Sequence, residues 1–471
     1  NINPADIESI EVMRNGTALY GAKGANGVLI IKTRRSKSMA TRITASASVG
    51  VSLLPKFVEV MDANQYRGYA SDLLGSTATK IRDFKFLNED PEYYYYPQYH
   101  NNTDWKDKVY REAFTQNYGI NIGGGDNIAR YNLSLGYTSA QSTLDCNDLN
   151  RLNIRFNTDI DLSDKFAVRF DASFANQSRT VRDDGAPESF DEGTSTAPSY
   201  LAYVKSPFLS PYTYGRGVLS KTHYDILDED YLDEALADVS NYNWRIANPL
   251  ALNEYADGDN KNRFETSMLN LAITPKYQFN KNLFVSEHFS YNLVNTNEKY
   301  YIPVNGVPDY YVNSVNAFRE NETRSLYSKQ ESMTSDTRID WNNRYGAHRI
   351  HLFGGARVNI ENYTLNTQLG YNTGSDKTPF INKNLMNVTT AGTKDSWTHV
   401  SWYGQAEYDF MSRYYLQASL SLDGSSRFGS DADGLELFGA PWGLFGGVQG
   451  SWVISNESWF ANVKPVNYLR L

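Results

Sequence analysis

The sequence predicts an all-β protein whose strands form an antiparallel wall with one apolar face and one polar face. Three observations predict it. Apolar and polar residues alternate through most of the chain after Thr41, most clearly in the runs 152–162 and 166–174. Short turns alternate with long segments between such runs. The 471 residues include 35 tyrosines and 33 glycines, and 14% of them are aromatic. Together these features are typical of a transmembrane antiparallel β-barrel with aromatic belts.

Alternation assigns one set of side chains to each face of a strand, because successive side chains point in opposite directions. The apolar set includes Leu152, Ile154, Phe156 and Phe170. The polar set includes four charged residues, which would be costly in a dry core. These are Arg155, Asp159, Arg169 and Asp171. We therefore expect these four residues to face a water-filled lumen, and the apolar set to face lipid.

Alternation predicts roughly a dozen strands in total, including the two runs named above. They are expected at 43–51, 118–122, 131–137, 152–162, 166–174, 269–273, 284–291, 350–358, 402–410, 414–422 and 444–452. The turns near Gly125, Asp164, Lys281, Gly346 and Met411 are short. The long segments are 52–111, 179–261, 300–322 and 370–394. This asymmetry is the outer-membrane pattern of short periplasmic turns and long external loops.

Residues 466–471 are expected to begin a further strand. A barrel must pair its last strand with its first to remove its edges. We therefore expect the chain to be truncated at both ends.

Residues 1–37 have a different pattern, which predicts the end of a small mixed α/β unit. Asn3 and Pro4 are suited to a helix start, residues 9–13 alternate like a strand, and another strand begins at Val28. Gly21, Gly24 and Gly27 lie between the two strands. A phosphate-binding loop runs from strand through glycines to a helix, and here the glycines lead into a strand. We therefore interpret them as turn residues that allow close backbone approach.

Composition argues against several function classes. The net charge is −9, and the only basic cluster, 32–37, is interpreted as a solvated connector, so a nucleic-acid partner is not expected. Cys146 is the only cysteine, which argues against a disulfide framework and a thiolate metal site. No apolar run approaches about eighteen residues, which argues against a membrane-spanning helix.

Several segments closely resemble the SusC/RagA family of TonB-dependent outer-membrane transporters. Residues 3–12, 18–21 and 24–28 resemble the end of that family's plug domain. The resemblance continues in family order along the rest of the chain, at 54–56, 104–105, 116–118, 131–137, 423–429, 451–452 and 469–471. Residues 14–17 depart from the family's usual lysine, aspartate and small-residue stretch.

This resemblance implies a barrel of about 22 strands in the complete protein, with a lumen too wide for side chains to fill and therefore plugged. Residues 1–37 would be the end of the plug, and 38–471 the first half of the barrel with its long extracellular loops. The glycines would let the plug's turns pack tightly inside the barrel wall. The implied function is TonB-dependent import of oligosaccharides or oligopeptides across the outer membrane of a Gram-negative bacterium, without a cofactor. The implied partners are a SusD-like surface lipoprotein, TonB, outer-membrane lipid and the cargo.

Tyrosines in the long loops are the candidate cargo contacts, because aromatic faces can stack on sugar rings or peptide side chains. They are Tyr94, Tyr95, Tyr212, Tyr214, Tyr310 and Tyr311. Anchoring at the membrane interface and packing of the loops on themselves are the alternative roles for these tyrosines.

The rival functions are an enzyme and a soluble all-β glycan-binding or glycan-hydrolysing protein. The acid pairs Asp183–Asp184 and 228–230 have the composition of glycosidase carboxylates, but adjacent acids on polar loops are usually solvated. His348 and His351 fall on opposite faces of a strand and cannot share a metal. The stretches 257–260 and 431–434 lack the full ligand series of a calcium loop. We therefore expect neither catalysis nor a metal site.

Overall fold

The protein is described here from a computed structural model. The structure describes residues 2–14, 16–36, 39–74, 85–183, 196–213, 247–258, 261–307, 310–312, 317–383, 385–429, 432, 434–460 and 466–471. Among these residues, no helix is long and apolar enough to cross a membrane.

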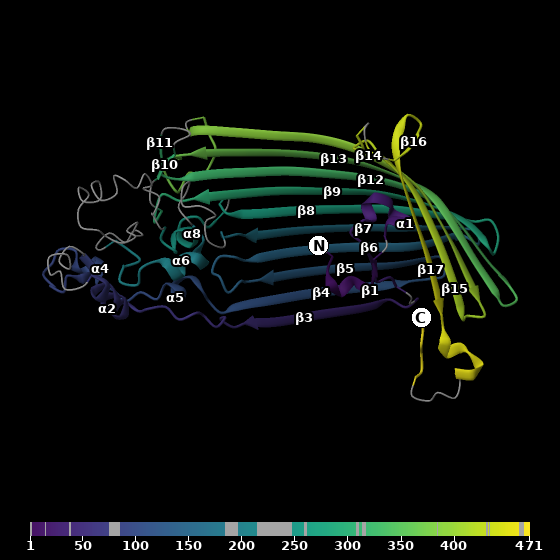
Figure 1. Cartoon of the computed structure of the whole chain (residues 1–471), viewed down its shortest axis with the longest axis horizontal. Helices are drawn as coiled ribbons and strands as arrows, with labels where there is room; N and C mark the ends of the chain where they lie inside the picture. Colours follow the sequence, from purple (N-terminus) through teal and green to yellow (C-terminus); the bar gives the residue numbers. More distant parts are fainter. Residues whose placement is uncertain are drawn as a thin grey trace.

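One antiparallel sheet of 13 strands dominates the molecule (Figure 1). Its strands are neighbours in space almost entirely in chain order, from β3 at one edge to β17 and the short β16 at the other. The strands are β3 (Arg42–Ser52), β4 (Ala113–Gly125), β5 (Ala129–Ala140), β6 (Leu149–Ser163), β7 (Phe166–Thr180), β8 (Arg263–Gln278), β9 (Leu283–Ile302), β12 (Glu322–Tyr345), β13 (His348–Tyr371), β14 (Met386–Phe410), β15 (Tyr414–Ser425), β16 (Leu435–Leu437) and β17 (Ala440–Trp452). The predicted all-β class and the roughly dozen antiparallel strands are confirmed.

The two faces of the sheet differ as the alternation predicts. Leu152, Ile154 and Phe156 on β6 are exposed, whereas Asn153 and Asn157 between them are buried. The buried face is the one on which the N-terminal residues pack. We call it the inner face, and the opposite one the outer face.

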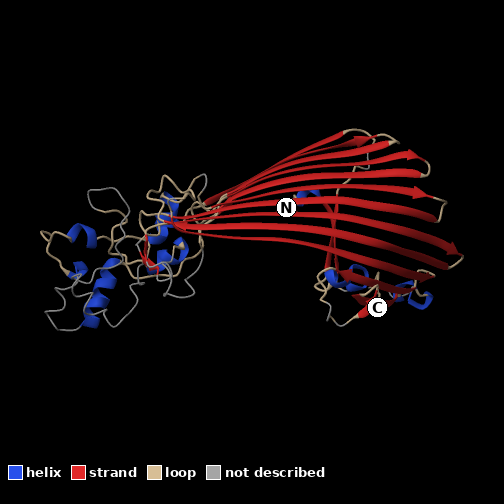
Figure 2. Ribbon diagram, turned by 90° about the horizontal axis from the view of Figure 1, so that it is seen from above, coloured by secondary structure: helices blue, strands red, loops and turns tan. Residues whose placement is uncertain are grey.

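Connections at the two ends of the strands differ in length. The turns at Gly125, Asp164, Lys281, Gly346 and Met411 link neighbouring strands at one end, and Figure 2 shows a group of helices within the loops at the other end. Gly346 has φ +59°, and Met411 and Ser412 have φ +56° and +54°, the left-handed conformations that a tight hairpin turn requires. The chain thus has a short-turn end and a long-loop end.

Strand β12 has no counterpart among the predicted strands. Serine, threonine and charged residues occupy both of its faces over much of its 24 residues, so apolar alternation is weak there. A membrane-spanning strand needs only about 9–11 residues. Strands of this length extend well past an apolar band, and both faces of the extension can be polar. For the same reason β13 and β14 are longer than predicted, and the loop between them spans only 372–385.

The N-terminal unit, residues 2–36, is a small separate layer on the inner face. It contains a two-stranded antiparallel sheet, which confirms the expected strand pair. The helix start at Asn3 is a single 3-10 turn, and the glycine stretch is partly helical. The elements are η1 (Pro4–Asp6), β1 (Ile7–Met13), α1 (Thr17–Tyr20), η2 (Gly21–Gly24) and β2 (Val28–Thr33).

The long-loop end carries short helices that we call the loop lobe, defined as the described residues between β3 and β4, between β7 and β8, and between β9 and β12. The lobe has a dry core of its own. Phe86 and Phe208 stack with ring centroids 4.3 Å apart, and Trp105 donates its indole N–H to the Ser206 carbonyl at 3.0 Å. Its elements are α2 (Ala63–Leu74), η3 (Lys85–Leu87), α4 (Tyr96–Tyr99), α5 (Trp105–Val109), α6 (Pro198–Val204), α8 (Ala251–Glu254), β10 (Tyr310–Val312) and β11 (Ala317–Arg319).

The last residues pair with the end of β17. The backbone N–H groups of Trp452 and Leu471 each donate to the other residue's carbonyl at 2.9 Å, and Val453 and Arg470 form an antiparallel bridge. Residues 470–471 therefore extend the sheet, as expected of the start of a strand. The connection from β17 carries the short turns η4 (Ile454–Asn456) and η5 (Ser458–Phe460).

Replacing Phe208 by alanine should loosen the loop lobe while leaving the sheet intact. Phe208 is fully buried in the lobe core, and truncating a buried phenylalanine costs about 3–5 kcal/mol. We expect faster amide hydrogen exchange in 85–112 and 196–213 and unchanged exchange in β12–β14. Tyr94→Ala, at a residue 85% exposed, is the control. Equal effects of the two variants would contradict an independently packed lobe core.

Candidate functional site

The inner face of the sheet and the N-terminal unit form an extended polar interface. Asp6, at the end of η1, is buried there and accepts a 2.5 Å hydrogen bond from the Ser134 hydroxyl of β5. Its other carboxylate oxygen lies 3.6 Å from Nε of Arg155 on β6. The Asn3 side chain caps η1 by accepting from the Ala5 amide at 3.1 Å, which fixes the turn that presents Asp6.

Arg35 makes the second contact between the unit and β6 and β7. Its guanidinium donates to Asp159 at 2.8 Å and to Asp171. Asp159 also accepts from Nε of Arg169 at 3.0 Å. The interpretation of residues 32–37 as a solvated connector is therefore wrong for Arg35. Its side chain is only 19% exposed. Such burial is tolerated because the guanidinium forms charge-assisted hydrogen bonds with two carboxylates of the wall at once.

The structure thus brings Arg155, Asp159, Arg169 and Asp171 together on the inner face of β6 and β7. Their partners Asp6 and Arg35 were not singled out from the sequence. Both lie outside the alternating runs that show which way a side chain points, and their partners lie more than 100 positions away. The sequence signal that could have linked them is that the N-terminal segment and the strands carry residues of opposite charge.

The other end of the unit meets β13–β15. The Ala22 amide donates to the Asp423 carboxylate at 2.7 Å, and the Ser421 hydroxyl donates to the Thr17 carbonyl at 2.8 Å. Nζ of Lys23 lies 3.6 Å from Glu361. Because the unit touches β5–β7 and also β13–β15, the sheet curves around it, and the inner face is concave.

The three predicted turn glycines have three different surroundings. A Cβ on Gly21, where φ is +58°, would lie 1.4 Å from the Asp423 carboxylate. A Cβ on Gly24 would lie 2.5 Å from the Gly16 carbonyl carbon, inside the unit. Gly27 has φ +88° and faces the Met13 carbonyl. Of the three, only Gly21 is placed against the wall.

A cavity of about 580 Å³ separates β2 from the wall strands β7–β9. Its polar lining comes from both sides and includes the charged residues Glu8, Lys32 and Arg169 as well as His288. Such a lining is suited to water and polar solutes, in contrast to the apolar outer face.

The candidate tyrosines do not form one site. Tyr94 and Tyr95 meet edge to face at 4.9 Å, and Nζ of Lys85 lies 4.2 Å from the Tyr95 ring centroid. Tyr212 instead donates its hydroxyl to Glu254, and this hydrogen bond raises the pKa of Tyr212 to about 12. Tyr310 and Tyr311 lie on β10, and Tyr214 lies outside the described residues.

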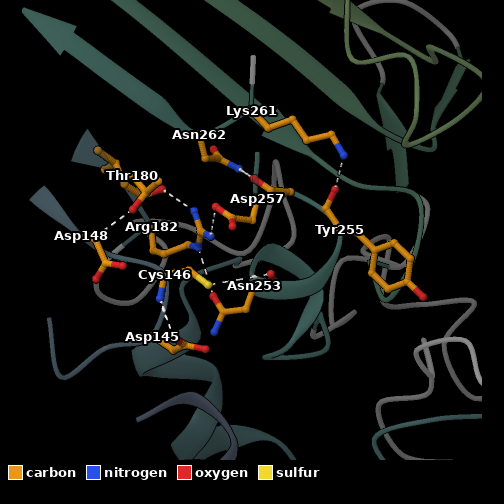
Figure 3. Close-up of polar contacts among 12 residues, drawn as sticks. Asp145, Cys146, Asp148, Thr180, Arg182, Asn253, Tyr255, Asp257, Lys261 and Asn262 are labelled. Carbon is orange, nitrogen blue, oxygen red and sulfur yellow. Dashed lines mark hydrogen bonds and ion pairs between the residues drawn. The ribbon is translucent and has the colours of Figure 1, made fainter. Parts of the chain in front are cut away.

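Partly buried polar contacts gather where the loop lobe meets the ends of β6 and β7 (Figure 3). The Arg182 side chain has no exposed surface and donates to Asn253 at 3.0 Å and to Asp257 at 3.2 Å. The Asp148 amide donates to the Thr180 hydroxyl at 2.8 Å. Burial raises the pKa of the neighbouring Cys146 thiol, which keeps it protonated and unreactive. We interpret this region as a structural joint.

The residues weighed for catalysis and metal binding have other partners. Asp183 accepts from the Tyr300 hydroxyl at 2.7 Å. His348 contacts the Tyr408 hydroxyl at 2.7 Å, and His351 contacts Asp340 and Glu407. Asp184, residues 228–230, and positions 259, 260, 431 and 433 of the two calcium-like stretches lie outside the described residues. Where side chains are described, no three His, Cys, Asp or Glu converge as a metal site would require.

Lys205 predicts a pH dependence of the loop lobe. It is buried, and desolvation lowers its pKa from 10.5 to about 7. Above pH 7 the folded lobe holds Lys205 neutral while the unfolded chain binds a proton, so stability should rise between pH 7 and about 10, by at most about 1.4 kcal/mol per pH unit. Lys205→Met should flatten this rise and the exposed control Lys56→Met should not, with exchange in 196–213 as the measurement. An identical pH slope in both variants would contradict the assignment.

Arg35→Met should weaken the hold of the N-terminal unit on the wall. Removing the guanidinium takes the Arg35 cation from Asp171 and leaves Asp159 with Arg169, in a partly enclosed site, at a cost of about 2–3 kcal/mol. We expect faster exchange in 28–36. Lys32→Met, which removes a neighbouring cation whose side chain is 64% exposed, should change exchange very little. Equal exchange rates in the two variants would show that Arg35 contributes no more than Lys32 to holding the unit on the wall.

No model of a known protein family matches the chain. Among curated relatives, it is 25% identical over 480 residues to the TonB-dependent receptor SusC of Bacteroides thetaiotaomicron. It is also 26% identical over 489 residues to the TonB-dependent receptor P39 of Formosa agariphila. Both matches cover 100% of this chain, but only 43% and 40% of the relatives. The chain therefore spans about two fifths of their length.

Solved structures show the same fold. The RagAB peptide transporter matches with a TM-score of 0.69 and 19% identity, over 100% of this chain and 51% of the solved one. The RagAB peptide importer in its closed-closed state matches with a TM-score of 0.68. The chain is thus similar in sequence to TonB-dependent receptors such as SusC, and it shares the fold of the RagAB structures.

Proposed function

We propose that the protein acts in the outer membrane of a Gram-negative bacterium as a TonB-dependent importer of oligosaccharides or oligopeptides. The main support is the two-faced sheet. Its outer face is apolar, and its inner face is polar and holds a small docked unit. A wall of this kind suits hydrocarbon outside and a solvated passage inside. In this proposal residues 1–37 are the end of a plug domain, and 38–471 are about half of the barrel with its extracellular loops.

The relatives support the choice of cargo class and partners. One relative is a TonB-dependent receptor named SusC, and the matched solved structures are named as a peptide transporter and a peptide importer. We infer a SusD-like lipoprotein at the long-loop end and TonB at the short-turn end. Import needs no catalytic residue of the chain, so we propose no enzymatic activity.

The loop lobe is the proposed place of cargo capture. A lobe with its own dry core can present loop side chains in a fixed arrangement. Tyr94 and Tyr95 are the contacts that we infer first, because they form an exposed aromatic pair next to Lys85. Tyr212, Tyr214, Tyr310 and Tyr311 remain further candidates.

Uptake by the complete receptor, expressed with its neighbouring lipoprotein, tests the importer proposal. Cells should accumulate labelled oligosaccharide or oligopeptide only when TonB and the proton gradient are intact. Tyr94→Ala together with Tyr95→Ala should raise the concentration needed for half-maximal uptake. Accumulation that is independent of TonB would contradict the proposal. Recovery of the chain in buffer after lysis would favour a soluble glycan-binding protein instead.

Depth in the membrane gives a matched test on one strand. Ile154 lies on the outer face of β6, and Leu162 is an exposed residue of the same strand next to the short turn, where the register shifts. Arginine on a lipid-facing position costs about 2–4 kcal/mol at the bilayer midplane and about 0–1 kcal/mol near the interface. Ile154→Arg should therefore destabilise the protein in phospholipid vesicles far more than Leu162→Arg, as measured by urea unfolding. Equal small effects would contradict a lipid-facing wall.

A further inference from the structure

Two sequence stretches that resemble the family separately, around Gly21 and at 423–429, form a single contact in the structure. Gly21 and Ala22 meet Asp423 across 401 positions of sequence. We propose that Asp423 is a positioning residue that holds the α1–η2 end of the N-terminal unit on β15 as a releasable latch. The inference that Asp423 holds this end of the unit on β15 rests on geometry alone. The role of release in transport rests on the proposed function.

The latch is built around the close approach of one glycine. The Ala22 amide donates to Oδ2 of Asp423 at 2.7 Å. Gly21 lies directly over the same carboxylate, so that any side chain there would overlap it. Two strand positions earlier on the same face, Ser421 donates to the Thr17 carbonyl at 2.8 Å. The wall therefore holds the backbone of residues 17–22 through two hydrogen bonds.

The chemistry of Asp423 makes this hold easy to reverse. The carboxylate is fully buried, and among the described residues its Oδ1 has no hydrogen-bond partner. His399 is close to it, with Nε2 lying 3.4 Å from Oδ2 of Asp423. A buried carboxylate with so few partners is poorly compensated for the water that it lost. Moving residues 17–24 away lets water reach Asp423 again, and this gain offsets part of the cost of breaking the contact.

The opposite end of the unit lacks this property. Arg35 there is matched by Asp159 and Asp171, so separation breaks two charge-assisted hydrogen bonds. The two ends are therefore expected to separate from the wall independently, with the Asp423 end separating first.

Gly27 provides a control for backbone strain. Gly21 and Gly27 both have positive φ, +58° and +88°, so alanine is strained at either position. Only Gly21 also meets the wall. A defect shared by Gly21→Ala and Gly27→Ala reports the turn, whereas a defect found only in Gly21→Ala reports the latch.

Amide exchange of the purified full chain in detergent tests the holding contact. Asp423→Ala should speed exchange of the Ala22 amide by roughly ten- to a hundred-fold, as for loss of a hydrogen bond to a charged group. Asp395→Ala, which removes a half-exposed carboxylate on β14, is the control. Gly21→Ala should disturb residues 17–24 more than Gly27→Ala, and adding Asp423→Ala should relieve only the Gly21→Ala defect. Unchanged Ala22 exchange in Asp423→Ala, or equal behaviour of the two glycine variants, would overturn the latch.

Urea dependence tests whether the latch is releasable. In the unmodified chain, Ala22 exchange should be insensitive to low urea, because a local opening exposes little surface. Amide exchange within β15 should accelerate steeply with urea. If Ala22 exchange and β15 exchange had the same urea dependence, the contact would open only with the whole sheet, and the proposal of a releasable contact would be overturned. These measurements need neither cargo nor TonB, so a failure of uptake would refute the import function without touching the latch.

Discussion

The opposite direction of successive side chains along a β-strand is the constraint on which the rest of this structure depends. One residue set forms the apolar outer face, and the set between forms an inner face on which charges can persist. If the register slipped by one residue, Ile154 and Phe156 would turn inward and Arg155 outward. The docking of the N-terminal unit and the polar cavity beside it both require that register.

The polar and charged side chains of the inner face find partners in the N-terminal unit as well as in solvent. Asp6 and Arg35 bring to the wall the charges that β6 and β7 need, and each meets a partner of opposite sign. At the other end, backbone groups of residues 17–22 make hydrogen bonds to the wall, and Lys23 lies beside Glu361. The unit therefore has one end held by matched charges, and one end held by hydrogen bonds around a tight glycine approach together with a single ion pair. This difference provides a physical basis for stepwise movement of the unit.

The loop lobe is stabilised differently from the sheet. It buries aromatic and aliphatic side chains in a dry cluster, and the fully buried Arg182 fixes its root to the strand ends. A packed lobe on long rigid strands can hold a capture surface away from the apolar band. Lys205 shows the energetic cost of building such a core from loop sequence. Its ammonium group loses its water there, and this desolvation lowers the pKa of Lys205 to about 7.

The sequence by itself determined the class of the fold, most of its strands and the sorting of short turns from long loops. These features depend on local periodicity and turn residues, which are readable in a single chain. It also placed Arg155, Asp159, Arg169 and Asp171 on one face. It did not reveal β12, because serine, threonine and charge on both faces remove the alternation. Only the tertiary structure decided that Asp6 meets Arg155, that Arg35 meets Asp159 and Asp171, and that Gly21 and not Gly24 or Gly27 approaches the wall. It also decided that Tyr212 has a different partner from Tyr94 and Tyr95. The contacts of Asp6, Arg35 and Gly21 with the wall join residues more than 100 positions apart, and nothing local in the sequence specifies which distant groups the curvature of the sheet brings together.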